Sequence, residues 1–302
     1  MEDSKTVRFE IISKEFSMKN IFKGVELLKY ISITPSKTLK ITSIESSFES
    51  CYNLDEVTID SNFDYSELIS TKKAFSFCRN LDEIPYNNID FSNAKDMSHM
   101  FEGTKIKDFS PEALNLSSVE TMASMFQDCK DLYSIVLPKS DSSNLKDISY
   151  MFSGCERLFK IDISGLNTSN VENMSSLFQD CSLLSSIINL ESFYTNNVKD
   201  MSHMFKDCRN IGNLNLTHFD TSNVEDMSYM FENGLRFSFS GIEKFNTEKV
   251  KNFEGMFYRC VNLYSLNLTK YITYRAENMR GMFKGCRNLQ ELNILKLIWL
   301  KI

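Results

Sequence analysis

Hydrophobic positions recur along this chain with a period close to 26 residues. A phenylalanine with apolar residues just before it returns at steps of 25, 26 or 27 residues, at Phe22, Phe48, Phe75, Phe101, Phe126, Phe152, Phe178, Phe205, Phe231, Phe257 and Phe283. All eight cysteines stand three residues after one of these phenylalanines, and every methionine except Met1 stands one or four residues before one. A spacing this regular over eleven units does not arise by chance, so the chain is a tandem repeat.

Within each unit, two patterns predict two elements. The first surrounds the repeat phenylalanine, where spacings of three and four predict a short helix with one apolar face, as at Val171, Met174, Leu177, Phe178 and Cys181. The polar triplet at 168–170, Thr-Ser-Asn, precedes this segment, and its side chains are suited to accept the free N–H groups of a helix start. An Asp or Asn before the first Met also favours a helix start.

The second pattern follows the cysteine. Leu266 and Leu268 alternate with polar residues, which is typical of a short strand with one buried face. The sequence therefore predicts an α/β solenoid of the leucine-rich-repeat kind. We expect a right-handed superhelix of about eleven 26-residue strand–helix units with a parallel sheet on one face. Strands about 4.8 Å apart would make that sheet on the order of 50 Å long. We expect each repeat phenylalanine to be buried in the core.

Two units and both chain ends depart from the pattern. Thr104 and Gly234 stand where cysteine is expected, so we expect bulges or shifts of register there. The predicted organisation is a capping segment at 1–14, the solenoid at 15–294 and an apolar tail at 295–302. Val7, Phe9 and Ile11 alternate with polar residues, as an edge strand would. At the other end, the expectation is either that a further domain was lost or that the tail packs on the last unit, with Trp299 folded over it as a lid.

The strings TSNVENMSSLFQDCSLL and FDTSNVEDMSYMF resemble the repeat of the BspA-type leucine-rich-repeat surface proteins. The resemblance covers roughly residues 15 to 295. It implies a surface-exposed protein that adheres to host matrix, host cells or other bacteria, with a host or matrix protein, or a glycan, as its partner. A chain of this family is expected at the cell surface or secreted.

Composition narrows the classes of partner. A net charge of -6 is unfavourable for binding nucleic acid. The first residues show no signal-peptide pattern, and no apolar run approaches the roughly 18 residues of a membrane span, so we expect no membrane insertion. The expected state is a monomer without a cofactor. The cellular location stays open between the surface and the cell interior.

Eight cysteines raise the alternatives of disulfides, a metal site or buried thiols. Their phase on the apolar face and the lack of a C-x-x-C pair favour a column of buried thiols. His99 and His203 share one outward phase and His218 lies in a loop, so all three are interpreted as surface residues. With no phosphate-binding loop and no catalytic arrangement, we expect no enzyme.

One strand position in each unit points away from the predicted core, and these positions define the strand face. It holds Ser32, Thr58, Asp162, Asn215, Asn267 and Asn293, and also Pro85, Val136 and Ile188. Such residues line an extended surface in a curved solenoid. The leading hypothesis is a non-enzymatic adhesion protein that binds a protein or glycan through this face. The alternatives are an intracellular protein–protein scaffold of the same fold and a strand face that is merely solvated.

Overall fold

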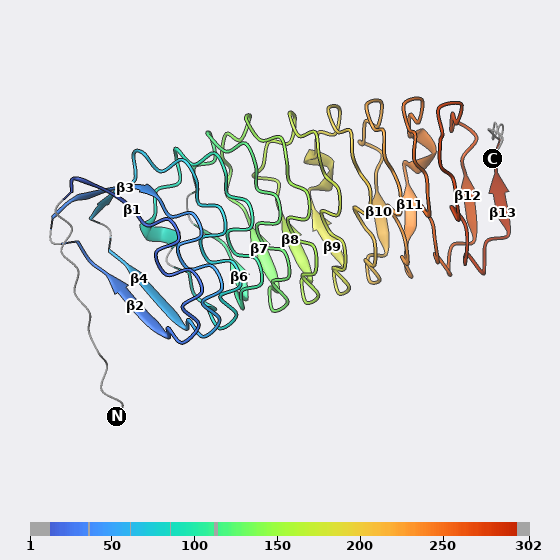
Figure 1. The fold of residues 1–302 in the computed structure, drawn as a ribbon. Coiled ribbons are helices and arrows are strands. Elements are labelled where there is room, and N and C mark those ends of the chain that lie inside the picture. Colours follow the sequence, from blue (N-terminus) through green and yellow to red (C-terminus); the bar gives the residue numbers. More distant parts are fainter. Residues whose placement is uncertain (1–12, 36, 61, 85, 112–113, 295–302) are drawn as a thin grey trace.

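The computed structural model describes residues 13–35, 37–60, 62–84, 86–111 and 114–294, which coil into an elongated parallel β-solenoid (Figure 1). The strands are β1 (Glu15–Ser17), β2 (Tyr30–Ile33), β3 (Leu39–Ser43), β4 (Glu56–Ile59), β5 (Phe63–Asp64), β6 (Asp108–Phe109), β7 (Ser134–Val136), β8 (Lys160–Asp162), β9 (Ser186–Ile188), β10 (Asn213–Asn215), β11 (Ser238–Ser240), β12 (Ser265–Asn267) and β13 (Glu291–Asn293). Short 3-10 helices are η1 (Tyr86–Asn88), η2 (Leu190–Ser192) and η3 (Ile242–Lys244). The predicted strand at Val7, Phe9 and Ile11 and the tail with Trp299 lie outside the described residues.

Every strand pairing within the described residues is parallel, as the repeat predicts, but the strands do not form one sheet. They form five short sheets: β1-β3-β5, β2-β4, β6-β7-β8-β9, β10-β11 and β12-β13. The prediction of one continuous sheet was wrong. Strands of three residues make few ladder bonds, so a change in the connecting segments is enough to separate neighbours. The break after β9 falls in the 27-residue step between Phe178 and Phe205.

The segment around each repeat phenylalanine is not helical, and the described residues contain no α-helix. The prediction of an α/β class was therefore wrong about the helices. Ser176 and Asp180, two residues before and after Phe178, have φ angles of 55° and 59°. The same two positions are left-handed in every rung from Phe22 to Phe283. A right-handed helix cannot contain such residues, so the chain runs as a series of tight turns.

Hydrogen bonds explain why these turns stack. At Met174, Ser176, Phe178 and Asp180 the N–H donates to a carbonyl of the next rung, 2.8–3.0 Å away. The N–H groups between them, such as that of Leu177, donate to the carbonyl three residues earlier or to a side chain. The turns bury one side of the chain just as a helix would. Apolar spacings of three and four therefore do not distinguish the two structures.

The repeat phenylalanines form a continuous column through the core. Ten neighbouring contacts join the eleven rings, with centroid distances of 5.3–6.0 Å. The nine rings from Phe48 to Phe257 are at most 1% exposed, which confirms the prediction that the repeat phenylalanines are core residues. Phe22 and Phe283, in the first and last described rungs, are half-buried because each has a neighbouring rung on one side.

The cysteines form a second column beside the rings. All eight are free thiols, and all are buried except the half-buried Cys286, which confirms the prediction of buried thiols. Each Sγ lies 2.9–3.1 Å from the carbonyl oxygen of the repeat phenylalanine in the preceding rung. The S–H group donates to this carbonyl, so the thiol joins two rungs as well as filling space. Burial raises the pKa of Cys129 and Cys260 to about 12.

Both units without cysteine shift the register of their strand, as predicted. Asp108 follows Phe101 by seven residues, yet it pairs with Ser134, which follows its own repeat phenylalanine by eight. Ser238 shows the same shift when it pairs with Asn213. Each unit therefore lacks one residue between the repeat phenylalanine and the strand.

A large ring fills the space in both shortened units, because the inward strand residue is phenylalanine there. Phe239 lies edge-on to Phe231, with ring centroids 4.8 Å apart. Phe109 makes the same kind of contact with Phe126 at 5.0 Å. At Gly234, the ring of Phe237 occupies the place that a side chain would need.

The Thr-Ser-Asn triplet joins neighbouring rungs and does not cap a helix. Thr168 Oγ1 donates to the carbonyl of Tyr194 in the next rung at 3.0 Å and accepts the N–H of the same residue at 2.8 Å. Asn170 Nδ2 donates to the carbonyl of Ser143 in the preceding rung at 2.8 Å. The predicted capping role was wrong because the segment that follows is not a helix.

This geometry predicts the effect of Thr168→Val, which keeps the shape of the side chain and removes both bonds. Thr168 is 1% exposed, so polar groups that lose it are left without a partner. We expect the free energy of unfolding to fall by about 1–3 kcal/mol, measured by urea denaturation. Ser169→Ala, in the same triplet, is the control and should change it by less than about 0.5 kcal/mol. Equal effects of the two substitutions would contradict the inter-rung role.

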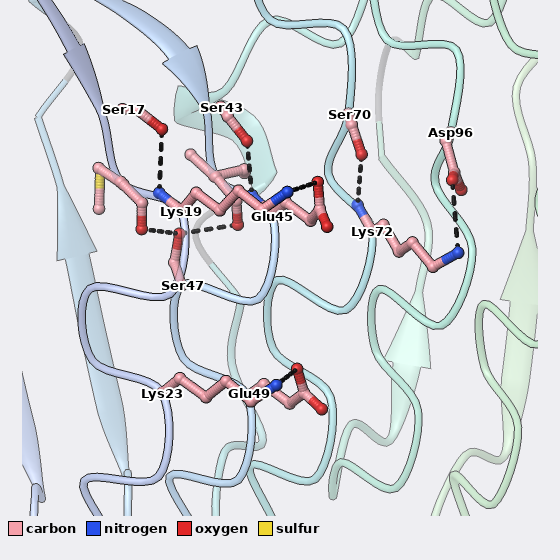
Figure 2. A network of polar contacts seen from close by, with 12 residues as sticks. Ser17, Lys19, Lys23, Ser43, Glu45, Ser47, Glu49, Ser70, Lys72 and Asp96 are labelled. Atoms are coloured by element: carbon pink, nitrogen blue, oxygen red, sulfur yellow. Dashed lines mark hydrogen bonds and ion pairs between the residues drawn. The ribbon is translucent and has the colours of Figure 1, made fainter.

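Charged side chains form further columns along the outside. Figure 2 shows two ion pairs between the first rungs, Lys19 with Glu45 and Lys23 with Glu49, each at 3.0 Å. Six residues before the repeat phenylalanine, lysine and glutamate alternate strictly over eight rungs: Lys95, Glu120, Lys146, Glu172, Lys199, Glu225, Lys251 and Glu277. Ion pairs of 2.6–3.4 Å join three of the neighbouring pairs in this column: Lys95 with Glu120, Glu172 with Lys199, and Glu225 with Lys251. Exposed pairs of this kind contribute little to stability, but they favour one register of stacking.

Candidate functional site

The predicted strand-face residues occupy outward strand positions, but the structure brings them together only in groups of two or three, the larger being Val136, Asp162 and Ile188. Ser32 lies opposite Thr58, and Asn267 lies opposite Asn293. All of the predicted site residues are exposed except Asp162, which is half-buried. They are spread over four separate sheets, and Pro85 lies outside the described residues. The strand face is therefore a row of short surfaces.

Three of these polar residues have a structural task at the end of their strand. Asn215 Oδ1 accepts the N–H of Thr217 at 3.1 Å and its hydroxyl at 2.7 Å. Asn267 makes the same two bonds with Thr269, and Asp162 makes them with the serine two residues on. This local turn accounts for Asn or Asp at the position without any ligand. The carboxamide Nδ2 groups of Asn215 and Asn267 are left for a partner.

An aromatic patch that the sequence reasoning missed lies on β7 and β8, and we define it by Tyr133, Val136 and Phe159. The rings of Tyr133 and Phe159 stack with centroids 6.0 Å apart and planes 4° apart. The three side chains are 55%, 48% and 42% exposed. Exposed apolar surface concentrated on neighbouring rungs is typical of a protein contact.

A signal for this patch was present in the sequence. Tyr133 and Phe159 each stand seven residues after a repeat phenylalanine, a phase that is polar or glycine in most other units. An aromatic residue there is outside the buried phases of the repeat and immediately precedes an exposed strand. Comparing units at that single phase would have found the pair.

His99 and His203 contact other side chains more closely than the sequence implied, His99 within its own rung and His203 in the next one. His99 Nδ1 lies 3.0 Å from a carboxylate oxygen of Glu102. The ring of His203 stacks on that of Tyr229 with centroids 5.1 Å apart, and burial lowers the pKa of His203. Both side chains are half-buried, so interpreting them as fully solvated was wrong.

Neither a metal site nor a membrane-spanning helix is found in the part of the chain that the structure describes. No three side chains of His, Cys, Asp or Glu come together there in a way that would hold a metal ion. No helix among those residues is long and apolar enough to span a membrane.

The fold and the repeat together define a leucine-rich-repeat protein of the BspA type, as the repeat strings indicated. A model of the family described as "Mycoplasma protein of unknown function, DUF285" matches residues 16–136, 106–215, 134–238 and 199–296. The chain belongs to this family. A search of curated proteins found no match to this chain.

Solved structures of bacterial repeat proteins are similar in fold. A leucine-rich repeat protein from Bacteroides ovatus is 19% identical with a TM-score of 0.61 over 91% of this chain, which spans 63% of that protein. A leucine rich cell surface protein from Faecalibacterium prausnitzii is 15% identical, with a TM-score of 0.38 over 89% of this chain and 84% of its own. The first of these shows the fold, and identities this low show nothing about the ligand.

Proposed function

We propose that this chain is a non-enzymatic binding protein whose strand face contacts a host or matrix protein, as an adhesin does. The observation that carries the proposal is the exposed, stacked pair of Tyr133 and Phe159, which directly precede β7 and β8. Rigid aromatic side chains supply large contact area at a low cost in conformational entropy, and they dominate the energetics of many protein interfaces. The rigid column beneath holds the pair in place before a partner arrives.

The strand face around the patch supports a partner that extends along several rungs. Asp162 and Ile188 lie in register beside Val136, which continues the surface across β8 and β9. Short polar side chains on the remaining strands, such as Asn215, offer hydrogen bonds at the rim. An apolar centre with a polar rim is the usual anatomy of a protein contact.

A binding assay with matched variants tests the proposal. The full chain is titrated against immobilised laminin and collagen, and the double variant Tyr133→Ser, Phe159→Ser is compared with Tyr194→Ser. Tyr194 is 61% exposed but lies beyond the strands, so its substitution controls for the loss of any surface tyrosine. We expect the double variant to bind at least about tenfold more weakly, an effect of about 1.4 kcal/mol. Equal binding by all forms would contradict the proposal.

A second measurement addresses location, where the alternative is an intracellular scaffold with a protein partner. Protease added to intact source cells should cleave the chain if the partner is a host or matrix protein. Survival of the chain in intact cells, with cleavage after lysis, would support the scaffold in its place.

A further inference from the structure

The solenoid surface opens into a groove of about 500 Å³ between β11 and β12, well away from the aromatic patch on β7 and β8. Its volume falls within the range of small-molecule sites. The groove coincides with a break in the sheet, because β11 pairs with β10 and β12 pairs with β13. Figure 1 shows both strands side by side toward the C-terminal end of the solenoid.

The groove lies at the irregular unit after Phe231. Gly234 replaces the cysteine, and Phe237 turns inward against it. The shift brings Phe239 into register with Leu214 of the preceding rung, while the following rung keeps the ordinary spacing. On the other side of this unit, no ladder joins β11 to β12.

A peptide strand does not fit between β11 and β12. The repeat rings beneath them, Phe231 and Phe257, remain stacked with centroids 5.6 Å apart. Inserting a strand would need two strand spacings, about 10 Å in total. The occupant of the groove must therefore rest on its surface and cannot complete the sheet.

The lining has the chemistry of a site for a polyhydroxyl ring. The ring of Tyr264 is 53% exposed, and the face of an aromatic ring attracts the polarised C–H groups of a flat ligand. The hydroxyls of Ser238 and Ser265 and the amide of Asn267 offer neutral hydrogen bonds. Glu243 is the single charged residue of the lining.

The polar groups are held in place by the chain itself. One carboxylate oxygen of Glu243 accepts the N–H of Gly241 at 3.0 Å, which leaves its other oxygen for a ligand. Asn262 Nδ2 donates to the carbonyl of Leu235 at 2.7 Å, which leaves its amide oxygen as an acceptor. Groups fixed in this way lose little entropy when a ligand binds.

We infer that this groove binds a neutral hexopyranose ring of a glycan, stacked on Tyr264 and hydrogen-bonded by Glu243, Asn262 and Asn267. The site shares Asn267 with the strand face but contains neither Tyr133 nor Phe159, which carry the proposed protein contact, so either can fail without the other. A neutral sugar fits because the lining carries no cation to pair with an acidic one. An extended peptide is disfavoured because the unpaired strand edges are too close together to admit it.

Saturation-transfer NMR on the full chain tests the inference, with the methyl glycosides of glucose, galactose, mannose and N-acetylglucosamine and the corresponding free sugars as probes. The variant Tyr264→Ala removes the stacking face. Tyr194→Ala is the matched control, since Tyr194 is 61% exposed and lies outside both the groove and the aromatic patch. Circular dichroism checks that both variants keep the fold.

We expect at least one glycoside to give a signal with the parent chain and with Tyr194→Ala. Tyr264→Ala should weaken its dissociation constant at least tenfold. A glycoside that binds while its free sugar does not would indicate a linked glycan as the source, and binding of both would indicate recognition of the ring alone. No signal from any probe, or equal binding by Tyr264→Ala, would overturn the inference.

Discussion

Replacing Phe178 by alanine should lower the free energy of unfolding by about 3–5 kcal/mol. Phe178 is fully buried, and its ring stacks between Phe152 at 5.9 Å and Phe205 at 5.7 Å. The substitution leaves a cavity that the hydrogen-bonded turns on either side cannot close. Urea denaturation followed by circular dichroism measures the change.

The matched control is Phe283→Ala, at the last ring of the column. Phe283 is half-buried and stacks on one side against Phe257 at 5.7 Å. We expect less than half of the effect seen at Phe178. Equal losses at the two positions would show that burial between two neighbours is not what the column contributes.

Raising the pH should destabilise the chain steeply, because seven cysteines are buried. Burial raises the pKa of these thiols, so the folded chain keeps protons that the unfolded chain releases above about pH 8.5. The unfolded state then binds fewer protons, and stability falls as pH rises. At pH values between its unfolded and folded pKa, each thiol lowers the free energy of unfolding by about 1.4 kcal/mol per pH unit. For seven thiols the loss is about 10 kcal/mol per pH unit.

The measurement is urea denaturation at pH 8, 9 and 10 with a reducing agent present. The triple variant Cys129→Ser, Cys155→Ser, Cys181→Ser keeps a donor for each phenylalanine carbonyl but has no thiol to titrate. Its stability should depend on pH less steeply, by about 4 kcal/mol per pH unit. Tyrosines also titrate in this range, but they are common to both proteins. Identical pH slopes would rule out the thiols as the cause.

The repeat phase was enough to predict the solenoid, the ring column and the buried thiols, because each follows from residues at fixed spacing. The local conformation around Phe178 was not predicted correctly. Spacings of three and four fit a helix and a series of turns equally well. A distinguishing signal stands directly before the cysteine, where Asp128, Gly154 and Asp180 occupy left-handed positions. Gly and Asp at one phase in several units favour that conformation over a helix.

The candidate sites were less accessible to sequence reasoning. The polar strand-face positions were placed correctly on outward strand positions, but part of their composition comes from turns, as at Asn215 and Asn267. The groove beside Tyr264 could not be predicted, because it depends on two strands failing to pair. The irregular unit at Gly234 was visible in the sequence, but its effect on the next rung was not.

Because lysine and glutamate alternate along the column from Lys95 to Glu277, removing an odd number of units has a different electrostatic effect from removing an even number. Removing the single unit that carries Lys199 would set Glu172 directly against Glu225, like charge on like. Removing two adjacent units would set Glu172 against Lys251 and restore attraction. The rings and thiols are the same in nearly every rung, so the contacts of the core do not depend on whether one or two units are removed. An array of this kind therefore grows or shrinks with least electrostatic conflict by whole pairs of units.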